Sequence, residues 1–488
     1  MIIVPPSSID SDQVIDRNTQ NQKKNLILSQ LEKEKRLFLC LWSGHFDKQV
    51  KMMLNTASPS CYSSKVQHLS KSRGKLPASS RLLRPKGKAR EKKKFFGVTS
   101  SILDKSSLPL SGLQGKAIVF PPKDEFPSRS EVLSNIPDEC FKKDTMKSLA
   151  YTVLSTVLTA FCGALAFAFI PLKLCWLPVW LSYAAVTGTI ATGCWVIAHE
   201  CGHNAFSENR ILQDFVGYSL HSLLLVPYFS WQRSHAVHHS RTNHLTEGET
   251  HVPYVKGEVK GDLNLNARKG LGEGLFTFIQ LLTHLVFGWP AYLITGATGG
   301  SARGITNHFL PWINTGELEL FPGSWKKKVL VSDVGVLAVI FSLGYWVYCC
   351  GVQPFVSLYL GPYIFVNIWL VLYTWLQHTD TDVQHLAAEE WSYIKGAFLT
   401  IDRPYGAVFD FLHHRIGSTH VAHHIECSIP HYKAQLATSA LKSKYPNFYL
   451  YDPTPIWSAL LRVASLCVAV EKRGEGRDTM WTFTSSAS

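Results

Sequence analysis

Four long stretches of the chain are almost free of charge, and they come in two pairs. They are residues 148–171, 174–198, 329–350 and 353–376. Only Leu172 and Lys173 separate the first pair, and Asp333 is the only charged residue in the second. Each stretch is long enough to cross about 30 Å of hydrocarbon as an α-helix. The sequence therefore predicts an all-α integral membrane fold with four transmembrane helices in two hairpins.

Positively charged residues indicate how these hairpins are oriented. Lys and Arg are concentrated before the first stretch, and Lys326, Lys327 and Lys328 directly precede the third. Because positive charge is retained on the cytoplasmic side of a membrane, both chain ends and the long central loop are predicted to face the cytosol or its equivalent. The hairpin tips near Lys173 and Gly351 then face the opposite side.

The net charge of +13 is largely the property of one segment. Residues 51–94 carry thirteen Lys or Arg and a single acid, Glu91. Such a local excess argues against a nucleic-acid-binding surface, so no nucleic-acid partner is expected. From Met53 onward this segment also has the composition of a transit peptide, and a solvated basic tail is the alternative interpretation. We predict four regions: a mostly disordered basic tail (1–110), a pre-membrane segment (111–147), a main domain (148–451) and a C-terminal tail (452–488).

Histidines gather in three clusters of regular spacing. Eighteen of the twenty histidines lie between His199 and His431, and eight of these belong to the sequences HECGH, SHAVHH and THVAHH. The clusters are His199 and His203; His235, His238 and His239; and His420, His423 and His424. On a helix, residues three and four apart project from one face, so each cluster presents its imidazoles together. Neutral imidazole binds iron, zinc, copper and nickel, and eight imidazoles exceed the need of one ion, so the pattern predicts two metals with open positions for a small reactant.

Two other classes of protein carry histidines in related patterns. HECGH also fits HExxH, in which two histidines bind zinc and Glu200 would be the general base of a zinc protease. The metzincin extension is missing, since Phe206 and Asn209 occupy the positions of its glycine and third histidine. A membrane metal transporter would bind its cargo near mid-bilayer, whereas these clusters lie outside the four stretches. Neither class explains two HxxHH clusters, so both are the less favoured alternatives.

Several segments together resemble the membrane fatty acid desaturases, specifically the methyl-end (omega-6/delta-12 or omega-3) acyl-lipid type. They are HECGHNAFS (199–207), LHSLLLVPYFSWQRSHAVHH (220–239), FGWPAYL (287–293), YTWLQHTD (373–380), TIDRPYG (400–406) and THVAHH with SIPHY (419–432). The resemblance extends from about residue 136 to about residue 451. HECGH and HVAHH are similar to delta-12 enzymes, whereas GSTHVAHH and SRTNH are similar to some algal omega-3 enzymes, so the position of the new double bond stays open.

The resemblance implies a non-haem di-iron centre that uses O2 to convert an acyl methylene pair into a cis double bond. The substrate would be a fatty acyl lipid or an acyl-CoA. The sequence has no HPGG haem-binding signature, so electrons would come from a separate carrier, cytochrome b5 in the endoplasmic reticulum or ferredoxin in a plastid. A multi-pass protein of the endoplasmic reticulum membrane is expected, with a plastid membrane as the alternative. A fatty acyl hydroxylase or acetylenase on the same scaffold is the alternative activity.

The resemblance also implies a ninth histidine ligand outside the three clusters. His378, at the end of the fourth stretch, is the predicted residue, and His413 or His414 is the second choice. Carboxylates that orient ligand imidazoles are expected nearby, and the candidates are Glu200, Asp214, Glu247, Glu249 and Asp402. The remaining histidines of this region are predicted to be ordinary polar or packing residues: His221, His244, His251, His284, His308, His385 and His431. An acyl tunnel has six candidate lining residues, for which helix packing is the favoured interpretation: Trp176, Trp180, Gly188, Gly193, Trp195 and Trp369.

Two further apolar runs are ambiguous. Residues 211–231 contain two ionisable side chains, and residues 275–298 are uncharged but interrupted by Gly and Pro. All three histidine clusters must meet at one centre, so an even number of membrane crossings separates the second cluster from the third. The second hairpin already supplies two crossings. Residues 275–298 are therefore predicted to lie in the membrane interface or to re-enter. The same reasoning, applied between the first and second clusters, keeps residues 211–231 from crossing the membrane.

Overall fold

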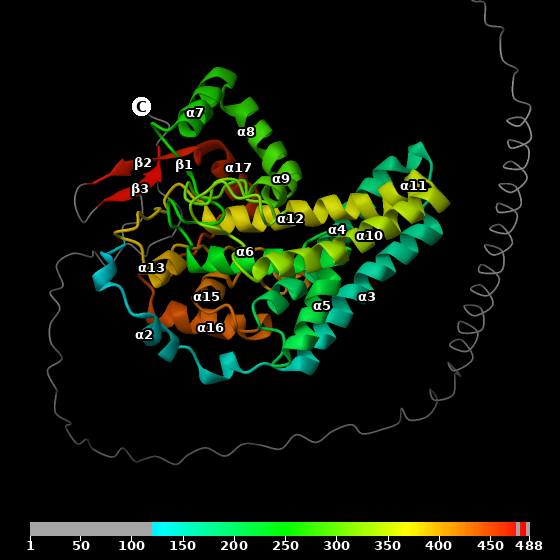
Figure 1. Cartoon of the computed structure of the whole chain (residues 1–488), viewed down its shortest axis with the longest axis horizontal. Coiled ribbons are helices and arrows are strands. Elements are labelled where there is room, and N and C mark those ends of the chain that lie inside the picture. The colour runs from blue at the N-terminus through cyan, green and yellow to red at the C-terminus, as the bar shows by residue number, and fades with distance from the viewer. Residues whose placement is uncertain (1–119, 475–478, 485–488) are drawn as a thin grey trace, which may run out of the picture. The chain divides into compact units, whose positions relative to one another are not determined.

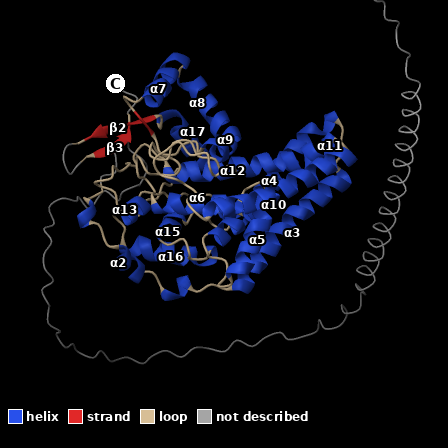
Figure 2. Ribbon diagram, viewed as in Figure 1, coloured by secondary structure: helices blue, strands red, loops and turns tan. Residues whose placement is uncertain are grey.

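The computed structural model describes residues 120–474 and 479–484, and the tail predicted for residues 1–110 lies outside these residues. Helices dominate the described part, as Figure 1 and Figure 2 show. It begins with short turns of helix: η1 (Lys123–Glu125), α2 (Arg129–Ser134) and η2 (Asp138–Phe141). Phe126, Val132 and Cys140 of this segment are buried in the same hydrophobic core as Val421 and Ile425. The pre-membrane segment therefore packs against the part of the molecule that carries the third histidine cluster.

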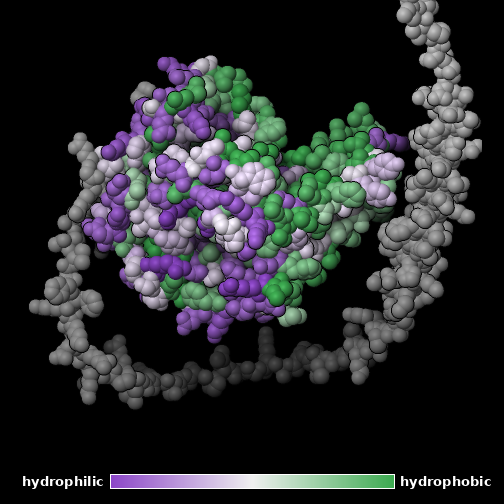
Figure 3. Space-filling view, viewed as in Figure 1, coloured by the Kyte–Doolittle hydropathy of each residue, from purple (hydrophilic) through white to green (hydrophobic). Residues whose placement is uncertain are grey.

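Five helices in the described residues are long and apolar enough to cross a membrane. They cover Thr145–Phe169, Leu174–Gly202, Glu273–Thr295, Trp325–Cys350 and Val352–His378. Four of them overlap the four predicted stretches and form the elongated bundle on the right of Figure 1: α3 (Thr145–Phe169), η3 (Leu174–Trp176) with α4 (Leu177–Gly202), α10 (Trp325–Cys350), and α11 (Val352–Phe355) and η5 (Val356–Leu360) with α12 (Gly361–His378). The projecting end of this bundle is mostly hydrophobic in Figure 3, as expected of a surface in contact with lipid.

The fifth apolar helix combines three elements: α8 (Glu273–Leu282), the π-helical turn η4 (Thr283–Phe287) and α9 (Gly288–Thr295). Only 11% of its most apolar stretch of 18 residues is buried. By length and composition this helix could cross a membrane, so the structure has one candidate more than the four that the sequence predicts. Its placement in the membrane interface stays a prediction, based on the requirement that the histidine clusters meet on one side.

Two glycines allow α4 to pack closely against its neighbours. A Cβ atom added at Gly188 would lie 2.4 Å from Phe365 Cβ and 2.5 Å from the backbone oxygen of Pro362, both in α12. A Cβ atom added at Gly193 would lie 2.5 Å from the backbone oxygen of Leu412. Both glycines therefore have the helix-packing role that was the favoured interpretation of their sequence.

Two helices too short to cross a membrane connect the first histidine cluster to the second. α5 (Arg210–Leu223) has 14 residues and α6 (Tyr228–Ser240) has 13, which corresponds to about 20 Å each. Asn209 caps α5, because its Oδ1 accepts a hydrogen bond from the backbone N–H of Leu212 at 3.1 Å. Pro227 directly precedes α6. Consequently no single helix covers the ambiguous run 211–231.

Shorter helices surround the bundle near its histidine-bearing end. They are α7 (Val259–Leu271), α13 (Tyr393–Phe398), α14 (Ala407–Leu412), α15 (His420–Ile425), α16 (His431–Lys444) and α17 (Ile456–Leu466). A buried ion network connects several of them. Arg403 pairs with Asp380 at 2.6 Å and with Asp452 at 3.0 Å, and Arg462 of α17 reaches the same two carboxylates at 2.8 Å. This network fixes the end of α12, the loop before α14 and α17 to one another.

A small sheet makes the expectation of an all-α fold incomplete. Its strands are β1 (Tyr254–Val255), β2 (Ala469–Arg473) and β3 (Met480–Phe483), in the order β1-β2-β3. β2 pairs in parallel with β1 and antiparallel with β3. The region predicted as a C-terminal tail thus contributes α17 and two strands to the described structure. Strands of two to five residues leave too short an alternating pattern to be read from the sequence.

Candidate metal centre

Four helices bring the three histidine clusters and His378 to one place. α4 ends at Gly202, so His199 lies in its last turn and His203 follows directly. α6 carries the second cluster and packs closely against α4, since a Cβ atom added at Gly202 would lie 2.5 Å from the ring of Trp231. α15 carries the third cluster, and α12 ends at His378. The clusters are therefore held by helix ends and helix faces rather than by long loops.

Five imidazoles form the first group. Each of these histidines offers a ring nitrogen, and these nitrogens lie within 4.8 Å of one another: His199, His203, His235, His239 and His423. The Nε2 atoms of His199 and His235 are 3.1 Å apart, and Nε2 of His203 is 3.2 Å from that of His199. The Nε2 atoms of His239 and His235 are 3.2 Å apart. Side chains from α4, α6 and α15 thus direct their nitrogens to one point.

Four imidazoles form the second group. Ring nitrogens of His238, His378 and His424 lie within 4.8 Å of one another. The Nε2 atom of His378 is 3.1 Å from Nε2 of His238 and 3.0 Å from Nε2 of His420. The sequence neighbours His238 and His239 therefore belong to different groups, and so do His423 and His424.

The two alternative residues for a ninth ligand lie elsewhere. His413 Nδ1 is 2.7 Å from the hydroxyl of Tyr373, and its Nε2 is 2.7 Å from the backbone oxygen of Thr189. His414 Nε2 is 3.0 Å from the hydroxyl of Ser155. Both rings thus have hydrogen-bond partners outside the two groups. The structure places the eight cluster histidines together with His378 and keeps His413 and His414 apart from them.

Burial keeps imidazoles of both groups uncharged. Desolvation, and then the charges of neighbouring imidazoles, lowers the pKa of these residues well below its ordinary value: His203, His235, His239, His420, His423 and His424. Desolvation lowers the pKa of His238 to about 3. A neutral imidazole keeps a lone pair for a metal ion. Within the described residues, the Nε2 atoms of His423 and His424 are buried without a hydrogen-bond partner. A bound metal ion would take up the lone pairs of these nitrogens. The two groups therefore fit metal-binding sites.

Thr242 orients one imidazole of the second group, and the sequence interpretation missed it. Its hydroxyl donates to the backbone oxygen of His238 at 2.8 Å and lies 3.0 Å from Nδ1 of His424. With its proton used on His238, the hydroxyl accepts from Nδ1–H of His424, which leaves the lone pair of that ring on Nε2. Thr242 lies in the turn just after α6, and its position four residues after His238 was the available signal.

Two of the five candidate carboxylates contact a clustered histidine or the backbone next to one. Glu200 Oε1 lies 3.8 Å from Nδ1 of His199, and Oε2 accepts a hydrogen bond from the backbone N–H of His431 at 2.8 Å. Asp402 Oδ1 accepts from the backbone N–H of Val421 at 2.9 Å. The other three bind different partners: Asp214 contacts Tyr228, Glu247 contacts Arg241, and Glu249 contacts Tyr292.

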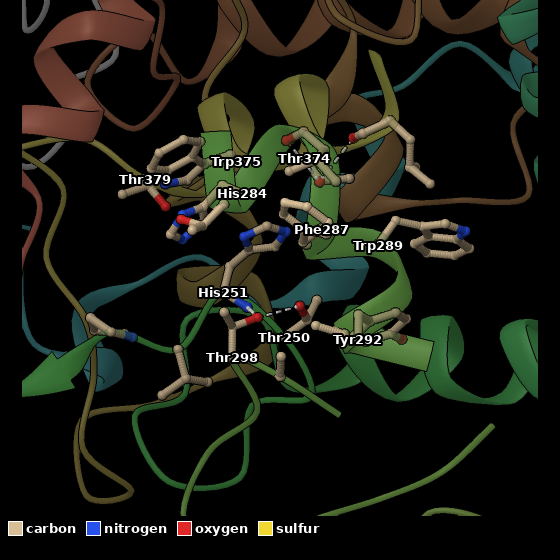
Figure 4. Close-up of a pocket in the computed structure, with 18 of the residues that line it drawn as sticks. Thr250, His251, His284, Phe287, Trp289, Tyr292, Thr298, Thr374, Trp375 and Thr379 are labelled. Atoms are coloured by element: carbon tan, nitrogen blue, oxygen red, sulfur yellow. Dashed lines mark hydrogen bonds between the residues drawn. The ribbon is translucent and has the colours of Figure 1, made fainter. Parts of the chain in front are cut away.

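A small cavity and a large cavity adjoin the histidines. The small cavity, of about 30 Å³, is lined by histidines of both groups, namely His199, His235, His378 and His420. The large cavity, of about 360 Å³ and drawn in Figure 4, has the size of a ligand pocket. Both cavities are lined by Trp195, His235, Leu370 and Thr374. A long apolar molecule in the large cavity would therefore reach the wall of the small one.

The lining of the large cavity departs from the sequence interpretation at Trp195, His251 and His284. Of the six tunnel candidates only Trp195 lines either cavity, so the other five are packing or surface residues in the described structure. His251 and His284, which the sequence suggested were ordinary histidines, line the large cavity, and Figure 4 shows the ring of His251 extending from its loop toward η4. His251 has φ +57° and stacks on His378 with ring centroids 5.5 Å apart. Neither feature has a local sequence signal.

Several proteins named as fatty acid desaturases are similar in sequence to this chain. The chain is 39% identical over 345 residues to the delta(12)-fatty-acid desaturase of Arabidopsis thaliana. These matched residues make up 70% of this chain and 87% of the relative. It is 36% identical to the omega-6 fatty acid desaturase, endoplasmic reticulum, of Brassica juncea, over 72% of this chain and 90% of the relative. It is 35% identical to the delta(12) fatty acid desaturase of Mortierella alpina, over 71% of this chain and 88% of the relative. The fatty acid desaturase family model matches residues 174–454, the span that contains all nine clustered histidines, so this chain belongs to the fatty acid desaturase family.

Proposed function

We propose that this desaturase inserts a cis double bond at the delta-12 (omega-6) position of an unsaturated fatty acyl chain, in the biosynthesis of polyunsaturated fatty acids. One observation carries the proposal: nine imidazoles converge in two groups beside a cavity that shares a wall residue, His235, with them. The names of the relatives support the position of the bond, since those compared are delta-12 or omega-6 enzymes. An omega-3 activity is the alternative position for the double bond.

The nine clustered histidines would hold two iron ions: His199, His203, His235, His238, His239, His378, His420, His423 and His424. When bound, two irons supply the activation of O2 that removal of two hydrogens from an acyl chain requires. The chain itself contributes rigid, buried and neutral ligands, because helix ends position the rings and Thr242 fixes the tautomer of His424. The small cavity at both groups has room for a diatomic reactant and excludes bulk water.

The large cavity would bind the acyl chain. Its walls are mainly aromatic and aliphatic, and it meets the small cavity at Trp195, His235, Leu370 and Thr374, which line both cavities. That contact places a short section of a bound chain next to the imidazoles, which is the positioning that a regiospecific reaction needs. An acyl hydroxylase or acetylenase would bind the acyl chain at the same place, but would add a hydroxyl group or form a triple bond instead of a double bond.

We assign the enzyme to the endoplasmic reticulum membrane, with cytochrome b5 as the electron donor. The name of the Brassica juncea relative and the apolar helices support this location. A plastid membrane with ferredoxin as the donor is the alternative.

Expression in a yeast that makes only monounsaturated fatty acids tests the activity. Fatty acid methyl esters from these cells should contain a new diene, with its second double bond at the delta-12 position, and the variant His238→Ala should make none. A hydroxy acid without a new diene would instead identify a hydroxylase. Metal flux across vesicles with no change in lipid would contradict both activities and favour a transporter.

A further inference from the structure

One wall of the large cavity is the apolar helix that runs from α8 through η4 to α9. Gln280 of α8 and Thr283, His284 and Phe287 of η4 line the cavity, and α12 forms the wall opposite, with residues such as Trp375. Figure 4 shows His284 beside Trp375 and Phe287 next to the ring of His251. The middle turn of an apolar helix is thus part of the cavity wall.

The same helix presents apolar side chains outward. Leu275, Phe278, Leu282 and Ile294 are exposed, and so is Phe287, at 59%. A water-soluble surface rarely carries such a row of large apolar residues, whereas a lipid-facing surface requires it. Phe287 belongs both to this outward row and to the cavity lining. The interior of the cavity and the lipid-facing surface therefore meet at Phe287.

The lining of the cavity carries no fixed charge. None of the described residues that line it is Asp, Glu, Lys or Arg. A soluble carrier with phosphate groups, such as coenzyme A, needs Lys or Arg where its head group remains at the mouth. A chain that stays anchored to a bilayer lipid leaves its head group in the membrane surface and needs no such residues at the cavity.

The turn η4 is a widened, π-helical turn. Thr283 Oγ1 donates to the backbone oxygen of Ile279 at 2.8 Å, and Nδ1 of His284 bonds the backbone oxygen of Gln280 at 2.9 Å. These side chains engage carbonyl groups of the helix ladder, and Pro290 has no N–H to offer, which together favour a widened π-helical turn. In the described residues η4 packs against α12 without a hydrogen bond: the rings of His284 and Trp375 are stacked 4.3 Å apart, and Leu285 packs against the apolar cluster that includes residues of α12. Separating these two walls would break no hydrogen bond.

We propose that the acyl chain of a bilayer lipid enters the large cavity sideways from the membrane, between η4 and α12, and that Phe287 forms the rim of this lateral opening. The inference rests on the proposed function, because it assigns the cavity to the acyl chain. Phe287 is a rim residue that the chain passes, while the histidine groups and their ligands stay unchanged.

Two matched arginine variants test the opening. Phe287→Arg places a charge on the rim, and Phe278→Arg makes the same change on the same helix, at a residue that is 61% exposed but does not line the cavity. Each purified protein is placed in nanodiscs that contain a phosphatidylcholine with a photoreactive diazirine in its acyl chain. Crosslinking to the cavity residues and iron content per chain are then measured. Phe287→Leu serves as the rescue variant, because it restores an apolar rim.

Phe287→Arg should lower crosslinking about tenfold or more, since a charged rim disfavours the passage of an apolar chain. Phe278→Arg and Phe287→Leu should stay within about twofold of the unmodified protein, and the iron content should be equal in all four proteins. Equal losses in both arginine variants, or no loss in Phe287→Arg, would overturn lateral access. Stronger crosslinking by a diazirine-bearing acyl-CoA than by the lipid would overturn it as well. Failure of the unmodified protein to make a diene would contradict the proposed function and leave the crosslinking comparison intact.

Discussion

Asp402 Oδ1 accepts a hydrogen bond from the backbone N–H of Val421, 2.9 Å away, at the start of the helix that carries His420, His423 and His424. Its other carboxylate oxygen accepts a hydrogen bond from the hydroxyl of Tyr449. Asp402 is completely buried, so neither donor has water as a substitute partner. One carboxylate thus sets the position of α15 from a loop that lies eighteen residues earlier in the chain.

Replacing Asp402 by Ala should destabilise the protein by about 1–3 kcal/mol, because two buried donors lose their acceptor. Asp402→Asn keeps the acceptor oxygen toward Val421 and should lose less. Thermal unfolding in detergent and iron content per chain measure the two effects. An Ala variant with the melting temperature and iron content of the unmodified protein would show that α15 is positioned by its packing alone.

His378 and His413 provide a direct test of the ninth ligand. His378→Ala should reduce the iron content from two ions per chain to about one or fewer, since His378 joins the second group through His238 and His420. His413→Asn should keep both ions, because His413 bonds Tyr373 and the backbone of Thr189 instead. Elemental analysis of the iron in both purified variants decides whether His378 or His413 is the ninth ligand. The reverse result, with iron lost only from the His413 variant, would exclude His378 as the ligand.

The contribution of Glu249 to the stability of the folded chain should fall as the pH rises from about 4.5 to 8. Burial raises the pKa of this carboxyl from 4.5 to about 8, and only Tyr292 donates a hydrogen bond to it. Between these pH values the folded state keeps a proton that the unfolded state releases, so the stability present below pH 4.5 is lost progressively, by at most about 1.4 kcal/mol per pH unit. Melting temperatures at pH 5.5 and 7.5 measure the slope. Glu249→Gln stays neutral at every pH, so the stability of the unmodified protein relative to this variant should fall between pH 5.5 and 7.5. A difference between the two proteins that is the same at both pH values would contradict this role of Glu249.

The close contact between α4 and α12 predicts opposite effects of alanine at two helical glycines. Gly188→Ala should cost about 1–3 kcal/mol, since the new Cβ would overlap Phe365 and the backbone oxygen of Pro362. Gly344→Ala in α10 has nothing within 4 Å of the new Cβ and should be neutral or stabilise by up to about 1 kcal/mol. Thermal unfolding compares the two variants. Similar melting temperatures would mean that α4 and α12 separate easily.

The membrane stretches and the histidine clusters could be predicted because their signals are local. An uncharged run of some twenty residues and a spacing of three and four residues each specify a helix and one of its faces. His378 came from the family resemblance, and its place in the second group depends on α12 ending beside α6. The division into two groups could not be read from the sequence, since the neighbours His238 and His239 join different groups.

Other features depend on contacts between distant parts of the chain. Thr242 meets His424 only because α6 and α15 pack together, and His251 lines the cavity only because its loop turns at a positive φ. The sheet pairs Tyr254 with Ala469, more than two hundred residues later. The hydrophobic periodicity of the sequence does not predict such contacts, because each depends on tertiary packing rather than on a local preference.

The adjacent residues His423 and His424 have a consequence for how the enzyme is made. One belongs to the first group and the other to the second, so a nascent chain lacks a member of both groups until α15 has been synthesised. Arg462, which pairs with the same carboxylates as Arg403, emerges from the ribosome later still. In the proposed di-iron enzyme both metal sites would therefore be completed only late in synthesis, by a nearly finished protein.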